Sequence, residues 1–403
     1  MNLLFVTPGF VFPLVGGQSI RTCNFLRELR ALGVSVTVVT IVEPGSNGQF
    51  LRVMEEFGCR VIPVPMNPDR VMTTAEKIAL RLQSTPATIC RYHDPAMLLA
   101  VRQVLREGTF NAVLCDQLHM AQYCHDIPLP KILNTDDPLF IQLRREAKVC
   151  ASRAKALSMR LEAAKYERYE RRMFAAFDHV LFVSAADRKQ VEDTLGCRNI
   201  EIIPQGVDTS FFTPDGPGLL HAPRDPVIAI TGTMNYAPNA AAAVYFVREV
   251  LPILRRTHPH VGCAVVGAYP SDEVKALARD HAGVVVTGFV DDIRPYLRSA
   301  AVYVSPAISG TGIKNKVLQA MAMEKGIVAT PLSMDGIPQA VNGESVLVAE
   351  GAEAIARAVA RLLDDPAEAA RLGANARRCI VEHYSWRAII GRLYGLLGHR
   401  RET

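Results

Sequence analysis

The sequence of 403 residues lacks several features that would place it in large classes of proteins. It contains no apolar run of the roughly 18 residues that a membrane-spanning helix requires. Its nine cysteines form no CxxC pair and show no cysteine–histidine spacing of a zinc site. We therefore expect reduced core thiols in a cytoplasmic protein.

A dinucleotide fingerprint is also missing. The glycine-bearing loop after residues 2–7 does not read GxGxxG, and no acidic residue closes the predicted strand at 34–40. An NAD-type cofactor is usually bound with both features, so their absence argues against a dehydrogenase. We expect no resident cofactor and no metal.

Charge is close to balanced outside one segment. The net charge is +5, but the segment from Arg144 to Arg172 alone holds ten Lys/Arg and four Glu, which is a local +6. Aromatic residues are not interleaved with these cations and no nucleic-acid module is recognisable, so we exclude nucleic acid as a partner. The segment could hold the protein on the inner, anionic face of a membrane, or it could be a solvated charged helix.

Buried strands alternate with helices along the whole chain, which predicts an α/β protein with doubly wound parallel sheets. The pattern indicates helices at 19–32, 74–84, 95–107 and 139–177 and strands at 112–116 and 179–184. Residues 211–226 are rich in proline and read as a linker. We predict two Rossmann-like domains, at 1–210 and 227–384, with the active site in a central cleft between them.

The stretch 305–337 contains the strongest candidate for a ligand site. Gly310 and Gly312 allow backbone amides to point at a ligand, Lys314 and Lys316 follow, and an apolar helix begins near residue 317. Amides, cations and a helix N-terminus together favour an anion, most plausibly phosphate. The alternative is an ordinary strand-to-helix turn with two solvated lysines.

Two further glycine turns occupy equivalent places in the two domains. Gly16 and Gly17 follow the first strand, with Arg21 one turn into the helix, and their alternative reading is a tight turn only. In the second domain the corresponding residues are Gly232, Thr233 and Asn235. Together with the turn at 310–316, these turns would surround a nucleotide diphosphate from both sides.

The motifs at these positions are similar to those of a known family. They are FVS at 182–184, IIPQGVD at 202–208, TGTMNYAPN at 231–239, TGFVDDIRPYL at 287–297, GTGIKNKVLQAMAMEKGIVAT at 310–330 and YSW at 384–386. Over essentially its whole length the chain resembles the retaining glycosyltransferases of family 4, which have the GT-B architecture. It looks most like bacterial transferases of exopolysaccharide and cell-surface glycan synthesis.

The resemblance implies a nucleotide-diphosphate sugar donor, bound mainly by the second domain, and a glycan or polyprenyl-linked acceptor, bound mainly by the first. It implies no obligatory metal, and a C-terminal helix at 385–403 that crosses back toward the first domain. Lys314 and Lys316 would stabilise the leaving diphosphate. The other donor-side positions that the resemblance implies are Gly16, Gly17, Arg21, Gly232, Thr233, Asn235, Phe289, Val290, Gly310, Thr311, Gly312, Gln319, Asp335 and Gly336.

Two departures from the family pattern concern the donor. The usual Glu-x7-Glu pair is absent, and its second position is Gln319. An amide accepts hydrogen bonds at one end only, so the ribose contact is in question. The usual Arg and Lys after Gly232 are replaced as well, so the cationic role falls on Lys314 and Lys316.

On the acceptor side the candidates end strands of the first domain. His119 follows the predicted strand at 112–116 and would orient the acceptor or sugar. Asp116, Asp136 and Asp137 could contact the acceptor hydroxyl or serve as its base, or could only cap helices and form turns. The competing functions are a non-catalytic binder of nucleotide sugars and a sugar-nucleotide 2-epimerase of the same fold.

Overall fold

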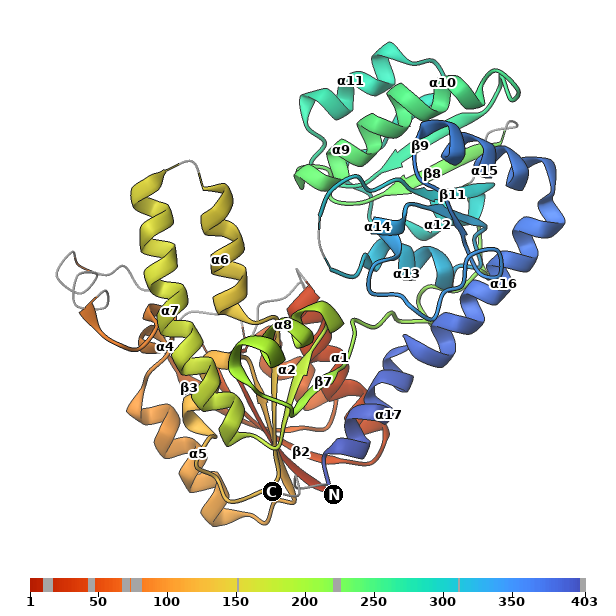
Figure 1. The fold of residues 1–403 in the computed structure, drawn as a ribbon. Helices are drawn as coiled ribbons and strands as arrows, with labels where there is room; N and C mark the ends of the chain where they lie inside the picture. Colours follow the sequence, from red (N-terminus) through yellow and green to blue (C-terminus); the bar gives the residue numbers. More distant parts are fainter. Residues whose placement is uncertain are drawn as a thin grey trace. The chain divides into compact units, whose positions relative to one another are not determined.

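The computed structural model describes residues 1–9, 17–42, 48–66, 73, 82–150, 152–219, 226–310 and 312–398. It divides into two compact units, Met1–Pro204 together with Ile390–Thr403, and Gln205–Ile389. Each unit has its own parallel sheet with helices on both sides (Figure 1). The predicted fold class, two doubly wound α/β domains, is confirmed.

The first unit is built on a seven-stranded sheet in the order β3-β2-β1-β4-β5-β6-β7. Its strands are rich in β-branched and apolar residues that suit a sheet buried on both faces. They are β1 (Asn2–Thr7), β2 (Ser35–Val42), β3 (Arg60–Pro65), β4 (Ala112–Asp116), β5 (Lys131–Asp136), β6 (His179–Phe182) and β7 (Ile200–Ile202).

Three helices of the first unit, α5, α7 and α8, begin at capping side chains that the sequence supplies. Before α5, the side chain of Asp94 accepts a hydrogen bond from the Ala96 amide, and Pro95 is the first helical residue. Before α8, the side chain of Ser184 accepts a hydrogen bond from the Asp187 amide. The helices are α1 (Gly17–Ala31), α2 (Gln49–Glu56), α4 (Ala87–Arg91), α5 (Pro95–Glu107), the 3-10 helix η1 (Leu118–Tyr123), α6 (Leu139–Val149), α7 (Arg153–Ala176) and α8 (Ala185–Leu195).

The second unit repeats this plan with six strands in the order β10-β9-β8-β11-β12-β13. Its strands are shorter, and apolar clusters lie against both faces of the sheet. They are β8 (Val227–Thr231), β9 (Gly262–Val266), β10 (Val284–Val286), β11 (Val302–Ser305), β12 (Ile327–Ala329) and β13 (Leu347–Val348).

The first helical segment of the second unit contains one turn of π-helix between two α-helical pieces. The helical elements are α9 (Ala237–Tyr245), η2 (Phe246–Val250), α10 (Leu251–Leu254), α11 (Asp272–Asp280), α12 (Arg294–Ser299), α13 (Asn315–Ala322), α14 (Pro331–Met334), α15 (Ala352–Asp364) and α16 (Pro366–His383). The last helix, α17 (Trp386–Leu396), begins in the second unit, and from Ile390 on its residues belong to the first.

Some predicted boundaries differ from the structure. The single helix predicted at 139–177 is wrong, because the chain is extended at Cys150 and Ser152 caps a new helix, α7. The predicted helix at 74–84 lies almost entirely outside the described residues. Backbone carbonyls in the described part of the predicted linker accept hydrogen bonds from three arginines of the second unit, Arg294, Arg298 and Arg377. These bonds attach the stretch to the second unit.

Both sheets reverse their strand order once. In the first unit β1 lies between β2 and β4, and in the second β8 lies between β9 and β11. Ligands of such sheets bind beyond the carboxyl ends of the two strands that flank the reversal. The turns after β1 and β4, and those after β8 and β11, are therefore where a site is expected.

Glu170 of α7 holds the start of α6. Its carboxylate, fully buried, accepts from the backbone amides of Leu139 at 2.7 Å and Phe140 at 3.2 Å. Burial raises its pKa to about 8. Pro138, the residue before α6, offers no side-chain cap, so Glu170 takes that role.

We predict that Glu170→Ala lowers the free energy of unfolding by about 2 kcal/mol, because two buried amides lose their acceptor. Glu167→Ala is the matched control, since it removes a carboxylate of α7 whose ion-pair partners among the described residues are Arg144 and Arg171 near the surface. Its effect should stay below about 0.5 kcal/mol. Denaturant unfolding and hydrogen exchange of the Leu139 and Phe140 amides measure both, and equal effects would contradict the assignment.

Candidate active site

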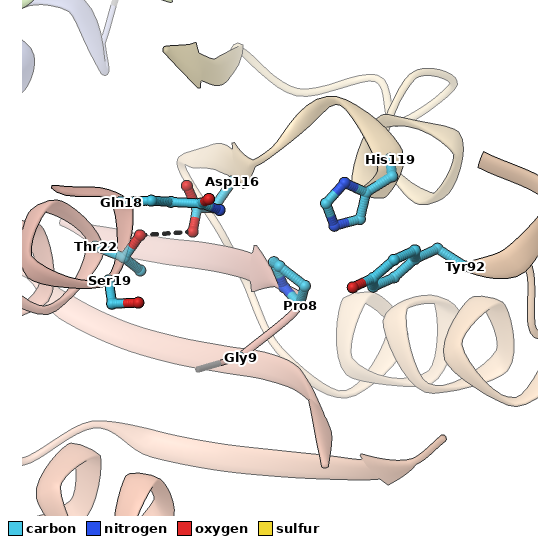
Figure 2. A pocket seen from close by; sticks show the side chains of 8 residues that line it. All are labelled: Pro8, Gly9, Gln18, Ser19, Thr22, Tyr92, Asp116 and His119. Carbon is cyan, nitrogen blue, oxygen red and sulfur yellow. Dashed lines mark hydrogen bonds between the residues drawn. The ribbon is translucent and has the colours of Figure 1, made fainter. Parts of the chain in front are cut away.

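A pocket of about 290 Å³ lies at the strand reversal of the first unit. Its walls come from the turn after β1, the start of α1, the end of β4 and η1 (Figure 2). The lining residues are Pro8, Gly9, Gln18, Ser19, Thr22, Tyr92, Asp116 and His119. Gly9 has φ 79°, and a Cβ there would lie 2.6 Å from the Ile41 carbonyl oxygen, so the backbone passes too close for any other residue.

Asp116 lies at the base of this pocket and is almost fully buried. The hydroxyls of Thr7 and Thr22 donate to its Oδ2 at 3.0 and 2.8 Å, and Asn134 Nδ2 donates to its Oδ1 at 2.8 Å. Burial raises its pKa to about 6, against the effect of these three donors. With its acceptor sites occupied, Asp116 is better placed to fix the strand ends than to take a proton.

The backbone is strained where these strands end. Gln117 has φ 77° directly after β4, and Asp136 has φ 58° at the end of β5, where the register with β6 shifts. Residues other than glycine rarely adopt such φ angles, and those that do are concentrated at functional sites. Asp137 follows at the surface, where partial burial and the charges of Asp187 and Asp136 raise its pKa.

Arg21 does not face solvent as its position in a ligand-binding turn would suggest. Its side chain is completely buried, and its Nε lies 3.0 Å from Asp136 Oδ1 and 3.2 Å from Asn134 Oδ1. Its NH1 donates to the Pro204 carbonyl at 2.9 Å. Burial lowers its pKa, and the nearby carboxylates of Asp136 and Asp116 oppose that shift. The guanidinium thus connects α1 with the end of β5 and with the segment that follows β7.

His119 lies on η1 with its ring 4.0 Å from that of Tyr92, centroid to centroid (Figure 2). Burial lowers its pKa to about 4, so the imidazole is neutral at physiological pH. Its Nε2 is buried and has no hydrogen-bond partner among the described residues. A neutral ring nitrogen of this kind can donate to or accept from a sugar hydroxyl that enters the pocket.

In the second unit the predicted glycine turns gather at the strand reversal. Lys316 Nζ, in the first turn of α13, donates to Asn239 Oδ1 at 2.7 Å, and Asn239 Nδ2 donates to the Thr233 carbonyl at 3.1 Å. A Cβ on Gly310 would lie 3.2 Å from Pro238. The segments that follow β8 and β11 are therefore in direct contact, although Asn239 and Lys316 are 77 residues apart in the sequence.

A third turn closes against the same place. Gly336 has φ 86°, and a Cβ there would lie 2.5 Å from Ile313 Cγ1, so only glycine fits. Its neighbour Asp335 raises the pKa of Lys314, although burial lowers it overall. Lys314 Nζ donates to the Gly312 carbonyl at 2.7 Å.

The two lysines repel each other across this turn. Burial and the charge of Lys314 lower the pKa of Lys316 to about 8. Lys314 is the N-cap residue of α13 and makes no side-chain cap, and the first amides of a helix have no acceptor within it. An anion seated here would relieve the repulsion and accept from these donors, so the turn is preorganised for negative charge.

The remaining donor-side candidates are distributed around this edge of the sheet. Phe289, 72% exposed, and the half-buried Val290 follow β10, and Gln319 is half-buried on α13. Gly232 begins the turn after β8, in which Thr233 and Asn235 are exposed. Gly17 is the first residue of α1. Gly16 and Thr311 lie outside the described residues.

The sequence alone did not single out several residues of these sites. Asn239, Tyr92 and the triad Thr7, Thr22 and Asn134 escaped notice, although Asn239 is the one polar side chain in an alanine-rich helix start. Within the described ranges, no helix is long and apolar enough to cross a membrane, and no group of three or more His, Cys, Asp or Glu could hold a metal ion.

Two family models together match most of the chain. Residues 15–211 match the family described as Glycosyltransferase Family 4. Residues 225–365 match the family described as Glycosyl transferases group 1. The two matches fall on the first and second units respectively.

Curated relatives include mannosyltransferases, and a solved structure shares the fold. A phosphatidyl-myo-inositol mannosyltransferase of Mycolicibacterium smegmatis is 26% identical over 98% of this chain and 92% of its own length. A GDP-mannose-dependent alpha-(1-6)-phosphatidylinositol monomannoside mannosyltransferase of that organism is 29% identical over 56% of this chain, but the match spans only 63% of that relative. The structure of Anabaena HepE in complex with UDP and glucose superposes with a TM-score of 0.63 at 14% identity, covering 98% of this chain and 99% of its own.

We predict that Lys316 titrates with a midpoint near pH 8 and that Lys314→Met raises this midpoint, because the substitution removes a neighbouring positive charge. The side-chain carbon shifts of labelled lysine in NMR spectra measure it. Lys325 is the internal control, since burial alone lowers its pKa. Its midpoint should not move in the same variant, and an unchanged Lys316 midpoint would contradict the proximity of the two lysines.

Proposed function

This chain belongs to the family 4 glycosyltransferases, and on that premise we propose that it transfers a hexosyl group from a nucleotide-diphosphate sugar to a glycan or lipid-linked acceptor. The anomeric configuration is retained, and the product belongs to cell-surface or exopolysaccharide synthesis. The observation that carries the proposal is the lysine-bearing turn at the strand reversal of the second unit.

The chemistry that this turn supplies is stabilisation of the leaving group. When the bond between sugar and diphosphate breaks, negative charge develops on the β-phosphate oxygens. Lys316 is held toward the site by Asn239, and Lys314 and the start of α13 lie beside it. Fixed cations and amides aimed at developing charge lower the barrier without reorganising at the moment of reaction.

The pH dependence of this step follows from the lowered pKa of Lys316. Its ammonium is the form that binds the diphosphate, and that form is lost as the pH rises through about 8 in the free protein. Bound diphosphate favours the charged lysine and raises this pKa. Donor affinity should therefore fall above pH 8 because of deprotonation of the free site.

The pocket of the first unit is a second candidate binding site. His119 is a neutral hydrogen-bonding group that suits a sugar hydroxyl, with Tyr92 holding its ring. Asp116, Asp136 and Arg21 support the strand ends around it. We assign this pocket to the acceptor or to the transferred sugar.

The relatives indicate which donors to test first. One relative is by its name GDP-mannose-dependent, and the HepE structure contains UDP and glucose. A panel of GDP-mannose, UDP-glucose and related donors, with and without acceptor lipid, should release nucleoside diphosphate with one of them. If no donor binds and none releases nucleoside diphosphate, the transferase assignment is refuted. NMR of the product shows whether the anomeric configuration is retained.

A second function, binding of a nucleotide sugar without catalysis, is favoured by one residue. Gln319 stands at the second position of the family's Glu-x7-Glu pattern, and only the oxygen of its amide can accept a hydrogen bond from a ribose hydroxyl. Donor binding without nucleoside diphosphate release under any acceptor would establish this alternative.

We predict that Lys316→Ala lowers kcat by on the order of a hundredfold or more, which is the usual cost of removing one charge-stabilising donor. Asn239→Ala should have a smaller effect of the same kind, because it leaves the lysine in place without its acceptor. Lys275→Ala removes an exposed lysine from the same unit and should be neutral. Near-normal turnover of Lys316→Ala, with an unchanged circular dichroism spectrum, would mean that the diphosphate binds elsewhere.

We further predict that Gln319→Glu tightens donor binding several-fold, because a carboxylate can accept from both ribose hydroxyls. Isothermal titration with the active donor measures this affinity. The matched control is the same substitution at Gln49, which is exposed on α2 of the first unit. Weaker binding by Gln319→Glu would show that residue 319 does not contact the ribose.

A further inference from the structure

Helices α6 and α7 form an antiparallel hairpin that rises from the first unit (Figure 1). The second half of α7 packs into the core through Tyr166, Tyr169, Met173 and Phe174. In the first half only Ala156 and Ala163 are buried. This part of the hairpin therefore stands clear of the core of its unit.

Large apolar side chains are exposed at the end of this hairpin. Val149 at the end of α6 is 86% exposed, and Leu157 and Leu161 on α7 are 58% and 61% exposed. At 100° per residue, Leu157 and Leu161 lie on one stripe with Ala154, opposite the buried Ala156 and Ala163. The outward face of the first half of α7 thus carries an apolar stripe where a solvated helix would be polar.

Cations flank this stripe on both sides. Arg153 and Arg160 lie along one side of it and Lys155 along the other, by the same helical geometry, and Lys148 precedes Val149. Residues 147–161 contain these four cations and no acidic residue. The ion pairs of the hairpin, such as Arg144–Glu167 and Lys165–Glu162, involve other residues.

We propose that this hairpin tip, defined by Lys148, Val149, Arg153, Lys155, Leu157, Arg160 and Leu161, docks on an anionic lipid bilayer. Leucines that enter the boundary between headgroups and acyl chains, with cations on either side that meet anionic headgroups, are the arrangement of an interfacial helix. A second copy of the chain is disfavoured as the occupant, because two tips would place eight unpaired cations together. Nucleic acid would leave the apolar stripe unused.

Docking on a membrane would place the protein beside a lipid-linked acceptor, so the proposal rests on the proposed function in this respect alone. Each cation near an anionic membrane raises binding about fivefold, and burial of the leucines adds to it. Neither contribution alone gives firm attachment, so we expect reversible binding that is sensitive to salt.

Cosedimentation with vesicles of phosphatidylcholine and phosphatidylglycerol tests the proposal in the full-length protein. The wild type should bind these vesicles, bind pure phosphatidylcholine weakly, and be released by high salt. Arg153→Glu with Arg160→Glu should weaken binding on the order of a hundredfold. Leu157→Ser with Leu161→Ser should weaken it about tenfold or more.

Matched controls carry the same chemical changes elsewhere. Lys275→Glu with Arg357→Glu reverses two exposed charges of the second unit, and Leu99→Ser removes an exposed leucine of α5 that is 68% exposed. Both should bind vesicles like the wild type. Equal losses in controls and tip variants, or no vesicle binding at all, would overturn the proposal.

Three further readouts separate the alternatives. Nucleoside diphosphate release with a water-soluble acceptor should be unchanged in the tip variants, so loss of lipid binding is distinguishable from failure of the transferase assignment. If the wild type binds vesicles but releases no nucleoside diphosphate, the docking proposal is supported and the transferase assignment is refuted. Dimerisation that the tip variants abolish, or tighter binding to duplex DNA than to vesicles, would overturn the lipid assignment.

Discussion

The reversal of strand order in each sheet is the constraint on which both candidate sites depend. Where the order reverses, the chain leaves neighbouring strands toward opposite faces of the sheet, which opens a crevice beyond their carboxyl ends. The pocket with Asp116 and His119 occupies this position in the first unit, and the lysine-bearing turn occupies it in the second. Similar topology thus presents two different chemistries, a neutral hydrogen-bonding pocket and a cationic turn.

Buried polar groups give each of these places its rigidity. In the first unit Arg21 connects Asn134, Asp136 and Pro204, while Asp116 collects three hydrogen bonds from neighbouring elements. In the second unit Asn239 fixes Lys316 and is itself fixed to Thr233. Each network gives hydrogen-bond partners to groups that would be costly to bury alone, which restrains the strand ends and turns that carry them.

The sequence was sufficient for the elements whose signals are local. Helix α5 and strand β4 have the predicted bounds, because Asp94-Pro95 starts the helix and an apolar run ending at Asp116 defines the strand. The grouping of Gly310, Lys314 and Lys316 followed from spacing in the same way. These signals lie within a few residues of the structure that they specify.

What the sequence did not reveal depends on tertiary contacts. The burial of Arg21 requires Asp136 and Pro204, which are more than a hundred residues away, and the link from Lys316 to Asn239 spans 77 residues. The break between α6 and α7 was missed because its one signal, Ser152 as a cap, falls in an otherwise continuous helical pattern. The assignment of residue roles remains a prediction that the proposed variants test.

The path of α17 has a consequence for how the protein is made. Ile390, Leu393 and Leu397 are buried and count with the first unit, although they leave the ribosome after the whole of the second. The nascent first unit must therefore wait, with part of its apolar surface uncovered, until translation has passed through the second. Folding of the first unit is therefore incomplete until its C-terminal residues have been synthesised. During that interval its uncovered apolar surface can be bound by chaperones.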